Sequence, residues 1–251
     1  MTSRFIDVAS KLCSWLFGLR PSCSKPIGDL SMNAIAYACD IGSIKSGAFA
    51  WARNSSLEKT PTASDSIDEL ITCIVEDGKA GKTIALGFEA PLFMPVPTQS
   101  AQLNSGRQYE SSRSMFAPAG ATVTTIAIHQ TAWILKQLHQ HLGHRLTLTM
   151  DWRADWRKRE AHLFIWEAFV SSGGHSDPQA HNSHKRDAAT ALQYFLANAD
   201  NLDGVNSVTC ENPLSLIAAA ALWSGWLADV RHLHSSCLVL RPEAPYQGEV
   251  L

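Results

Sequence analysis

The chain has 251 residues, of which 45% are hydrophobic and 18% are charged, a balance that is typical of a globular protein and excludes a disordered one. Its formal net charge is −2, from 21 basic and 23 acidic residues, so no global positive field attracts nucleic acid. Any contact with nucleic acid must therefore come from a local basic patch, from metal ions or from a partner chain.

The amino-terminal segment carries apolar side chains at helical spacing between residues 4 and 19. We expect an amphipathic helix and a linker over residues 1–31, followed by a single domain over residues 32–251. The helix either packs on this domain or docks on a protein partner or a membrane surface.

Strands and helices alternate along the domain. The runs at 33–40 and 47–53 are apolar on both faces, which is typical of strands in a sheet that is covered on both sides. The elements that follow are a polar loop over 55–66, a helix over 66–77, a strand over 83–88, a long insertion over about 90–119, a helix over 121–142, strands over 145–150 and 161–170, helices over 184–197 and 213–230, and a short strand over 237–240. This order predicts an α/β fold with a mixed central sheet.

Cysteine usage and hydropathy indicate the compartment. The six cysteines are scattered and form no CxxC pair, which argues against a zinc ribbon and favours a reducing environment. No signal peptide is recognisable, and no stretch approaches the roughly 18 apolar residues that a membrane span needs. These features predict a cytoplasmic protein without a membrane span.

Three acidic residues lie at the ends of elements that are far apart in the sequence. Asp40 ends an apolar strand directly before a glycine turn, Glu89 follows the strand at 83–88, and Asp187 lies at the start of a helix. Carboxylate oxygens are the ligands that Mg²⁺ and Mn²⁺ prefer, and element ends hold such groups rigidly at a cleft. We therefore expect a divalent-metal site that is capable of two-metal phosphodiester hydrolysis.

Four further residues are candidates for the same site. His184 precedes Asp187 by three positions, so the two share a helix face, and its imidazole could be a ligand or a general acid–base group. Lys45, Arg107 and Arg113 could bind the phosphates of the substrate, the arginines through paired donors. Each of these three cations could equally be an ordinary surface residue.

Each acid also has an ordinary structural interpretation. Asp40 could cap backbone N–H groups of the turn, Glu89 could be an exposed strand end, and Asp187 complements a helix dipole whatever its function. Glu167 lies within an apolar strand, where it either lines the cleft as a fourth acid or faces solvent at a sheet edge.

Segments around these residues resemble the RNase H-like superfamily, in particular its RuvC-like branch, over roughly residues 33–195. The segments are Asp40-Ile-Gly with Gly47-Ala-Phe-Ala-Trp, then Gly87-Phe-Glu89-Ala-Pro, and His184-Lys-Arg-Asp187-Ala-Ala-Thr-Ala. The arrangement is most similar to a group of uncharacterised predicted nucleases, in which an arginine-bearing segment, loosely matched by Gly106-Arg107 through Arg113, follows the second acid.

The resemblance implies a mixed sheet of about five strands flanked by helices. It also implies metal-dependent cleavage of DNA or RNA, with Asp40, Glu89 and Asp187 as ligands of Mg²⁺ or Mn²⁺ and His184 nearby. Two alternatives remain: a catalytically inactive RNase H-like module in a protein complex, and an actin-like or sugar-kinase-like phosphotransferase. The phosphotransferase would need a second Asp-x-Gly unit, for which Asp203-Gly204 is a poor candidate.

Overall fold

The structure is a computed structural model that describes residues 34–55, 58–110, 115–156, 158, 162–170, 180–242, 245–248 and 250, without the side chains of 180–182. The chain divides after Leu30 into two units, and all described residues belong to the second, Ser31–Leu251. The helix and linker expected over 1–31, and Arg113, lie outside the described residues.

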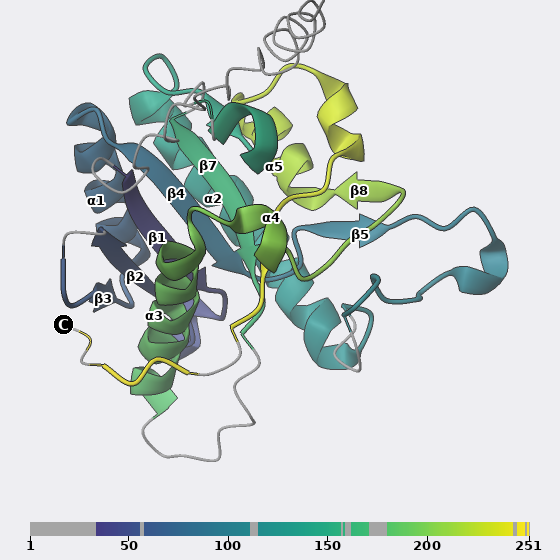
Figure 1. Ribbon diagram of the computed structural model, residues 1–251, viewed down its shortest axis with the longest axis horizontal. Helices are drawn as coiled ribbons and strands as arrows, with labels where there is room; N and C mark the ends of the chain where they lie inside the picture. Colours follow the sequence, from purple (N-terminus) through teal and green to yellow (C-terminus); the bar gives the residue numbers. More distant parts are fainter. Residues whose placement is uncertain are drawn as a thin grey trace, which may run out of the picture. The chain divides into compact units, whose positions relative to one another are not determined.

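A mixed sheet forms the centre of the described unit (Figure 1). Its strands lie in the order β3 (Thr62–Ser64), β2 (Ala50–Ser55), β1 (Ala34–Asp40), β4 (Thr83–Glu89), β7 (Leu163–Ala168) and β6 (Leu148–Thr149), and β9 (Val239–Leu240) also pairs with β7. β2 is antiparallel to β1 and β3, whereas β4, β6, β7 and β9 follow the direction of β1. The predicted α/β class with a mixed, helix-flanked sheet is confirmed.

Helices cover both faces of this sheet. The helices are α1 (Ile67–Lys79), α2 (Pro118–Leu142), α3 (Ala180–Asn198), the short α4 (Leu202–Val205) and α5 (Leu216–Ser224). α3 packs against β1 and β2, in front of the sheet in Figure 1, whereas α1, α2 and α5 contribute to the core on the other face. None of the helices in the described part of the chain combines the length and apolar character needed to cross a membrane.

Alternation along the strands divides the core into two layers. In β1, Tyr37 and Cys39 pack into the layer of α1 and α2, and Ala36 and Ala38 pack into the layer of α3. The side chains of β1 towards α3 are small, which lets this helix approach the sheet closely. We call this side of the sheet the α3 face.

Three parts of the chain differ from the sequence prediction. The expected polar loop at 55–66 contains β3, and the expected helix at 213–230 is divided into a strand β8 (Pro213–Ser215), α5 and a 3₁₀ helix at Val230–His234. Gly225 ends α5 in the left-handed conformation at φ 95°, which apolar periodicity does not reveal.

The insertion after Glu89 is also partly ordered into a strand. β5 (Phe93–Pro95) pairs with β8 in a separate two-stranded sheet. Figure 1 shows this sheet and the loop between β5 and α2 extending to one side of the central sheet. We call β5, residues 96–110 and β8 the arm.

Candidate functional site

Asp40 and Glu89 are neighbours at the carboxyl edge of the sheet. They are the last residues of β1 and β4, and the parallel register pairs them directly. Paired residues of adjacent strands lie about 4.8 Å apart and point to the same face. Because Ala36 and Ala38 pack towards α3, alternation puts Asp40, and with it Glu89, on the α3 face. Both are shielded: Asp40 is 9% exposed, and Oε2 of Glu89 is buried.

α3 brings two more of the predicted residues to this edge. His184 Nδ1 lies 2.6 Å from Oδ2 of Asp40. Asp187, one turn further along the helix, is 8% exposed and precedes the alanines that pack into the α3-face layer. We call Asp40, Glu89, His184 and Asp187 the acidic cluster.

The acidic cluster favours a charged histidine. The pKa of His184 is raised above its ordinary value, chiefly by the hydrogen bond to Asp40 and further by the negative charges of Asp40 and Asp187, against the opposing effect of partial burial. The imidazolium therefore offsets part of the negative charge that the carboxylates concentrate at this edge.

The donor set of the acidic cluster fits a hard divalent cation in kind, because it offers carboxylate oxygens from three elements. Among the described residues, no group of three or more His, Cys, Asp or Glu side chains is arranged to hold a metal ion as it stands. Oδ2 of Asp40 is engaged by His184. A cation would therefore need Asp40 to exchange this contact for coordination, together with rotation of the other carboxylates at the edge.

The turn after Asp40 is shaped by close backbone approaches. A Cβ added at Gly42 would lie 2.1 Å from the carbonyl oxygen of Ala48, so only glycine fits there without a shift of the backbone. Gly47 adopts a left-handed φ of 70°. Lys45 lies on this turn in the 3₁₀ helix Ile44–Ser46 and is exposed, five residues after Asp40.

Sequence reasoning missed Gln130, which supports this turn from α2. Its Nε2 donates to the carbonyl oxygen of Gly42 at 2.7 Å, and the side chain is only 7% exposed. Gln130 lies on the inward stripe of α2, between Ile126 and Ile134, where an apolar residue is the rule. The sequence signal that could have identified Gln130 is a polar residue on the apolar stripe of a helix.

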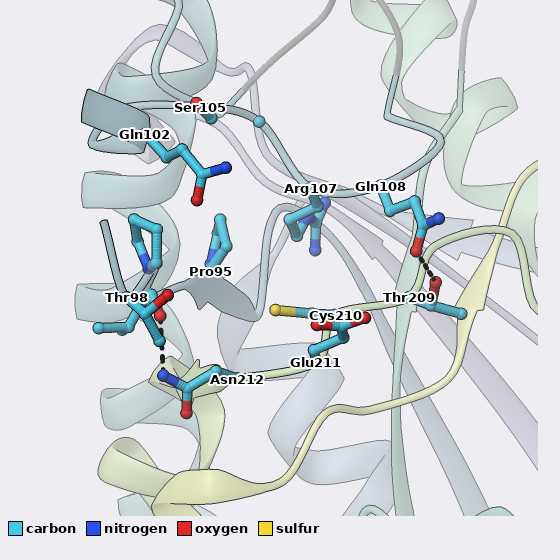
Figure 2. Close-up of a pocket in the computed structure, with 13 residues that line it drawn as sticks. Pro95, Thr98, Gln102, Ser105, Arg107, Gln108, Thr209, Cys210, Glu211 and Asn212 are labelled. Carbon is cyan, nitrogen blue, oxygen red and sulfur yellow. Dashed lines mark hydrogen bonds between the residues drawn. The ribbon is translucent and has the colours of Figure 1, made fainter. Parts of the chain in front are cut away.

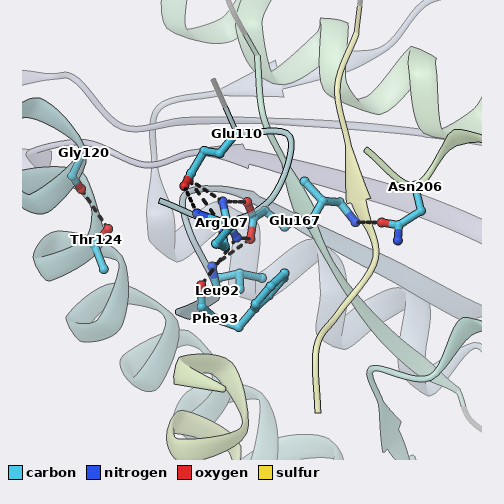
Figure 3. A network of polar contacts seen from close by, with 9 residues as sticks. Leu92, Phe93, Arg107, Glu110, Gly120, Thr124, Glu167 and Asn206 are labelled. Atoms are coloured by element: carbon cyan, nitrogen blue, oxygen red, sulfur yellow. Dashed lines mark hydrogen bonds and ion pairs between the residues drawn. The ribbon is translucent and has the colours of Figure 1, made fainter. Parts of the chain in front are cut away.

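Arg107 is not at the surface and does not face the acidic cluster, which corrects its prediction as a phosphate contact. Its Nη1 and Nη2 each lie 2.7 Å from an oxygen of Glu167, and Nη2 lies 2.9 Å from Glu110 (Figure 3). All three side chains are buried. Burial opposes the charge of Arg107, yet the two carboxylates raise its pKa, so the guanidinium stays charged and its donors are occupied.

Glu167 is neither a fourth acid of the cleft nor an exposed edge residue. It is fully buried in β7, and alternation places it on the face opposite to the α3 face, since Trp166 and Ala168 belong to the α3-face layer. Besides binding Arg107, its Oε2 accepts the N–H of Leu92 at 2.9 Å. Glu167 therefore holds Leu92, directly before β5, and Arg107 of the arm against the central sheet.

The arm and residues 209–212 line an open pocket of about 370 Å³ that is separate from the acidic cluster (Figure 2). Pro95, Gln102, Arg107 and Cys210 are among its lining residues, and the side chains of Gln102 and Cys210 point towards its interior. Its one fully buried ionic group, Arg107, is directed to Glu110 and Glu167. No member of the acidic cluster lines it, so this cavity is not the site that the acids define.

Comparison of the chain with protein-family models, with curated proteins and with solved structures gives no match.

Proposed function

We propose that this protein is a metal-dependent nuclease with an RNase H-like fold, which hydrolyses phosphodiester bonds of DNA or RNA. The observation that carries the proposal is the direct pairing of Asp40 with Glu89 on the α3 face, where α3 adds His184 and Asp187. A mixed sheet with flanking helices, of the kind that the sequence resemblance implies, supports it.

In this proposal Asp40, Glu89 and Asp187 hold Mg²⁺ or Mn²⁺. The bound cations would supply an activated water and stabilisation of the leaving oxygen. His184 would release Asp40 for coordination and hold or transfer a proton beside the scissile phosphate. Exposed Lys45 would contact a phosphate from the turn after Asp40.

The compartment proposed with this function is the cytoplasm. Cys39, Cys73, Cys210 and Cys237, the cysteines of the described part, are free thiols. This supports a reducing environment.

A second candidate is a non-catalytic module with the same fold. The contact of 2.6 Å between His184 and Asp40 favours it, because an imidazolium can occupy the place of a cation permanently. The phosphotransferase alternative gains no support, because Asp203 lies in the short helix α4, accepts Trp152 Nε1 at 3.0 Å and pairs with Arg153 at 2.8 Å. Asp203 is thus engaged in structural contacts and does not end a strand.

The test combines metal binding with cleavage. Mn²⁺ should bind the native chain in a calorimetric titration, and single- and double-stranded DNA and RNA should be cleaved with Mn²⁺ but not with EDTA. Asp40→Asn and Glu89→Gln should abolish both properties, and circular dichroism should show that both variants remain folded. The control is Asp200→Asn, an exposed carboxylate beyond α3, which should change neither. Cleavage that survives in Asp40→Asn would overturn the assignment, and a folded chain that binds no Mn²⁺ would favour the non-catalytic module.

A further inference from the structure

A second cavity, of about 680 Å³, lies between α3 and the end of β9. It is lined by Tyr194 of α3, by residues 204–207, and by Arg241 and Pro242, which directly follow β9. We propose that this cavity binds a phosphate group through Arg241, and that in the working protein this phosphate belongs to the nucleic-acid strand a few nucleotides from the bond that is cleaved. The assignment of the strand rests on the proposed function, whereas the phosphate site does not.

The register of the sheet places Arg241 on the same edge as the acidic cluster. Glu89 pairs with Ala168, and Ala168 pairs with Leu240, so the three residues form one row across β4, β7 and β9. Two strand spacings separate Glu89 from Leu240 by about 10 Å between backbones. Since each nucleotide of a helical strand advances ~3.4 Å along the helix axis, this distance corresponds to at most about three nucleotides.

The cavity lies at the carboxyl edge of the sheet, between the two layers of the core. Tyr194 and Val205 pack against the α3-face layer, to which alternation assigns Asp40 and Glu89, whereas Arg241 stacks on Phe169, which packs against the layer on the opposite face. A strand that follows the carboxyl edge of the sheet can therefore reach the acidic cluster and the cavity together.

Arg241 is held in a way that leaves its donors available. Its guanidinium carbon lies 5.0 Å from the centre of the Phe169 ring. Stacking uses the face of the guanidinium group and leaves the N–H groups at its rim, which match the oxygens of a phosphate. In the part of the chain that the structure describes, no carboxylate pairs with Arg241, in contrast to Arg53 and Arg107.

The remaining lining favours an anion over a cation. Among the residues that the structure describes, no acidic side chain lines the cavity, and Asp203, which precedes the lining residue Gly204, is paired with Arg153. Oδ1 of Asn206 accepts the N–H of Val239 at 2.9 Å, so the amide group of Asn206 keeps its N–H₂ donors for other partners. The hydroxyl group of Tyr194 is a further possible donor. One guanidinium with neutral donors suits a single phosphate group.

The experiment measures binding of a labelled single-stranded oligonucleotide to the full chain in EDTA, by fluorescence anisotropy over a series of salt concentrations. EDTA prevents metal-dependent cleavage, so binding is read whether or not the protein is a nuclease. Arg241→Gln should weaken binding several-fold and reduce the slope of log K against log salt by about 0.7, as expected for the loss of one phosphate contact on a single strand. Arg241→Lys should retain most of the slope, because it retains the charge.

The matched control is Arg145→Gln, which removes an exposed arginine beyond the end of α2 and should change neither affinity nor slope. Native binding of the oligonucleotide, of AMP and of inorganic phosphate by a folded Arg241→Gln would overturn the proposal. A parallel titration with AMP and with inorganic phosphate separates the two sources of the phosphate. If Arg241→Gln weakens AMP binding but leaves oligonucleotide binding unchanged, the cavity binds free nucleotides and the assignment to a strand is wrong. Normal oligonucleotide binding by a chain that never cleaves would count against the nuclease alone.

Discussion

His184 Nδ1 lies 2.6 Å from Oδ2 of Asp40, so an ion pair ties the helix that covers the α3 face to the end of the strand beneath it. The two residues are 144 positions apart in the sequence. The contact therefore contributes both to the charge balance of the acidic cluster and to the packing of α3 on the sheet.

The first prediction concerns stability against pH. Because the pKa of His184 in the folded chain is raised above the ordinary value of 6.5, its stabilising effect is complete below that value and is lost as the pH rises through the folded-state pKa. His184→Gln should therefore lower the melting temperature at about pH 6 and have little effect at about pH 9. The control, His129→Gln, removes an exposed histidine of α2 and should leave the pH profile native. An equal loss at both pH values would show that the histidine acts through packing.

The second prediction separates local from global stability at Gln130. Gln130→Met removes the donor that holds the carbonyl oxygen of Gly42, but it also removes Oε1, which is buried without a hydrogen-bond partner among the described residues. These effects oppose each other, so the free energy of unfolding should change by less than about 1 kcal/mol. Amide hydrogen exchange in residues 41–48 should nevertheless accelerate, by about tenfold, because the turn loses its clamp. Gln140→Met, at an exposed position of α2, should change neither quantity.

The third prediction compares a buried and an exposed ion pair. Glu167→Gln leaves Arg107 buried with only Glu110 to balance its charge, and should cost about 3 kcal/mol in urea unfolding. Glu58 pairs with Arg53 at 3.3 Å, but its side chain is 46% exposed. Glu58→Gln should therefore cost less than about 1 kcal/mol. Equal costs for the two variants would mean that the buried network does not hold the arm.

The fourth prediction tests the packing of the α3 face at Gly87. A Cβ at this position would lie 2.3 Å from Cζ2 of Trp166, a buried ring that also stacks on Phe195. Gly87→Ala should therefore destabilise the fold by about 1–3 kcal/mol through overpacking. Gly78→Ala is the comparison: its Cβ would meet the side-chain tips of Leu142 at 2.8 Å and of Leu146 at 3.2 Å rather than a ring, and the helix α1 gains from alanine. It should cost less than Gly87→Ala, as measured by chemical unfolding.

The sequence predicted those elements whose pattern is local. β1 and β4 are apolar runs that end at a glycine turn and before a proline, so the positions of Asp40 and Glu89 at strand ends followed directly. α1 was equally accessible, because Ser66 caps its start and accepts the N–H of Glu69. The pairing of Asp40 with Glu89 required in addition that β1 and β4 be adjacent and parallel, which only the folded sheet provides.

Buried ion pairs were the least predictable feature of the structure. Arg107 and Glu167 are 60 positions apart, and each can be buried only because the other is there. A single sequence offers no sign of such a pair, so Arg107 was expected at the surface. The sequence also did not single out Arg241. The short strand before it was predicted, but its place beside the row of Glu89, Ala168 and Leu240 depends on the pairing of β9 with β7.

Because Leu92 and Arg107 are both held by Glu167, the loop residues 96–105 between them can be exchanged for another sequence. Glu167 accepts the N–H of Leu92, shortly after β4, and binds Arg107 beyond residues 96–105, on the face that carries no member of the acidic cluster. A shorter turn between Leu92 and Arg107 would leave the contacts of both residues with Glu167 intact. The length and side chains of this loop could thus be redesigned, or could diverge between related chains, without a change in the acidic cluster on the other face of the sheet.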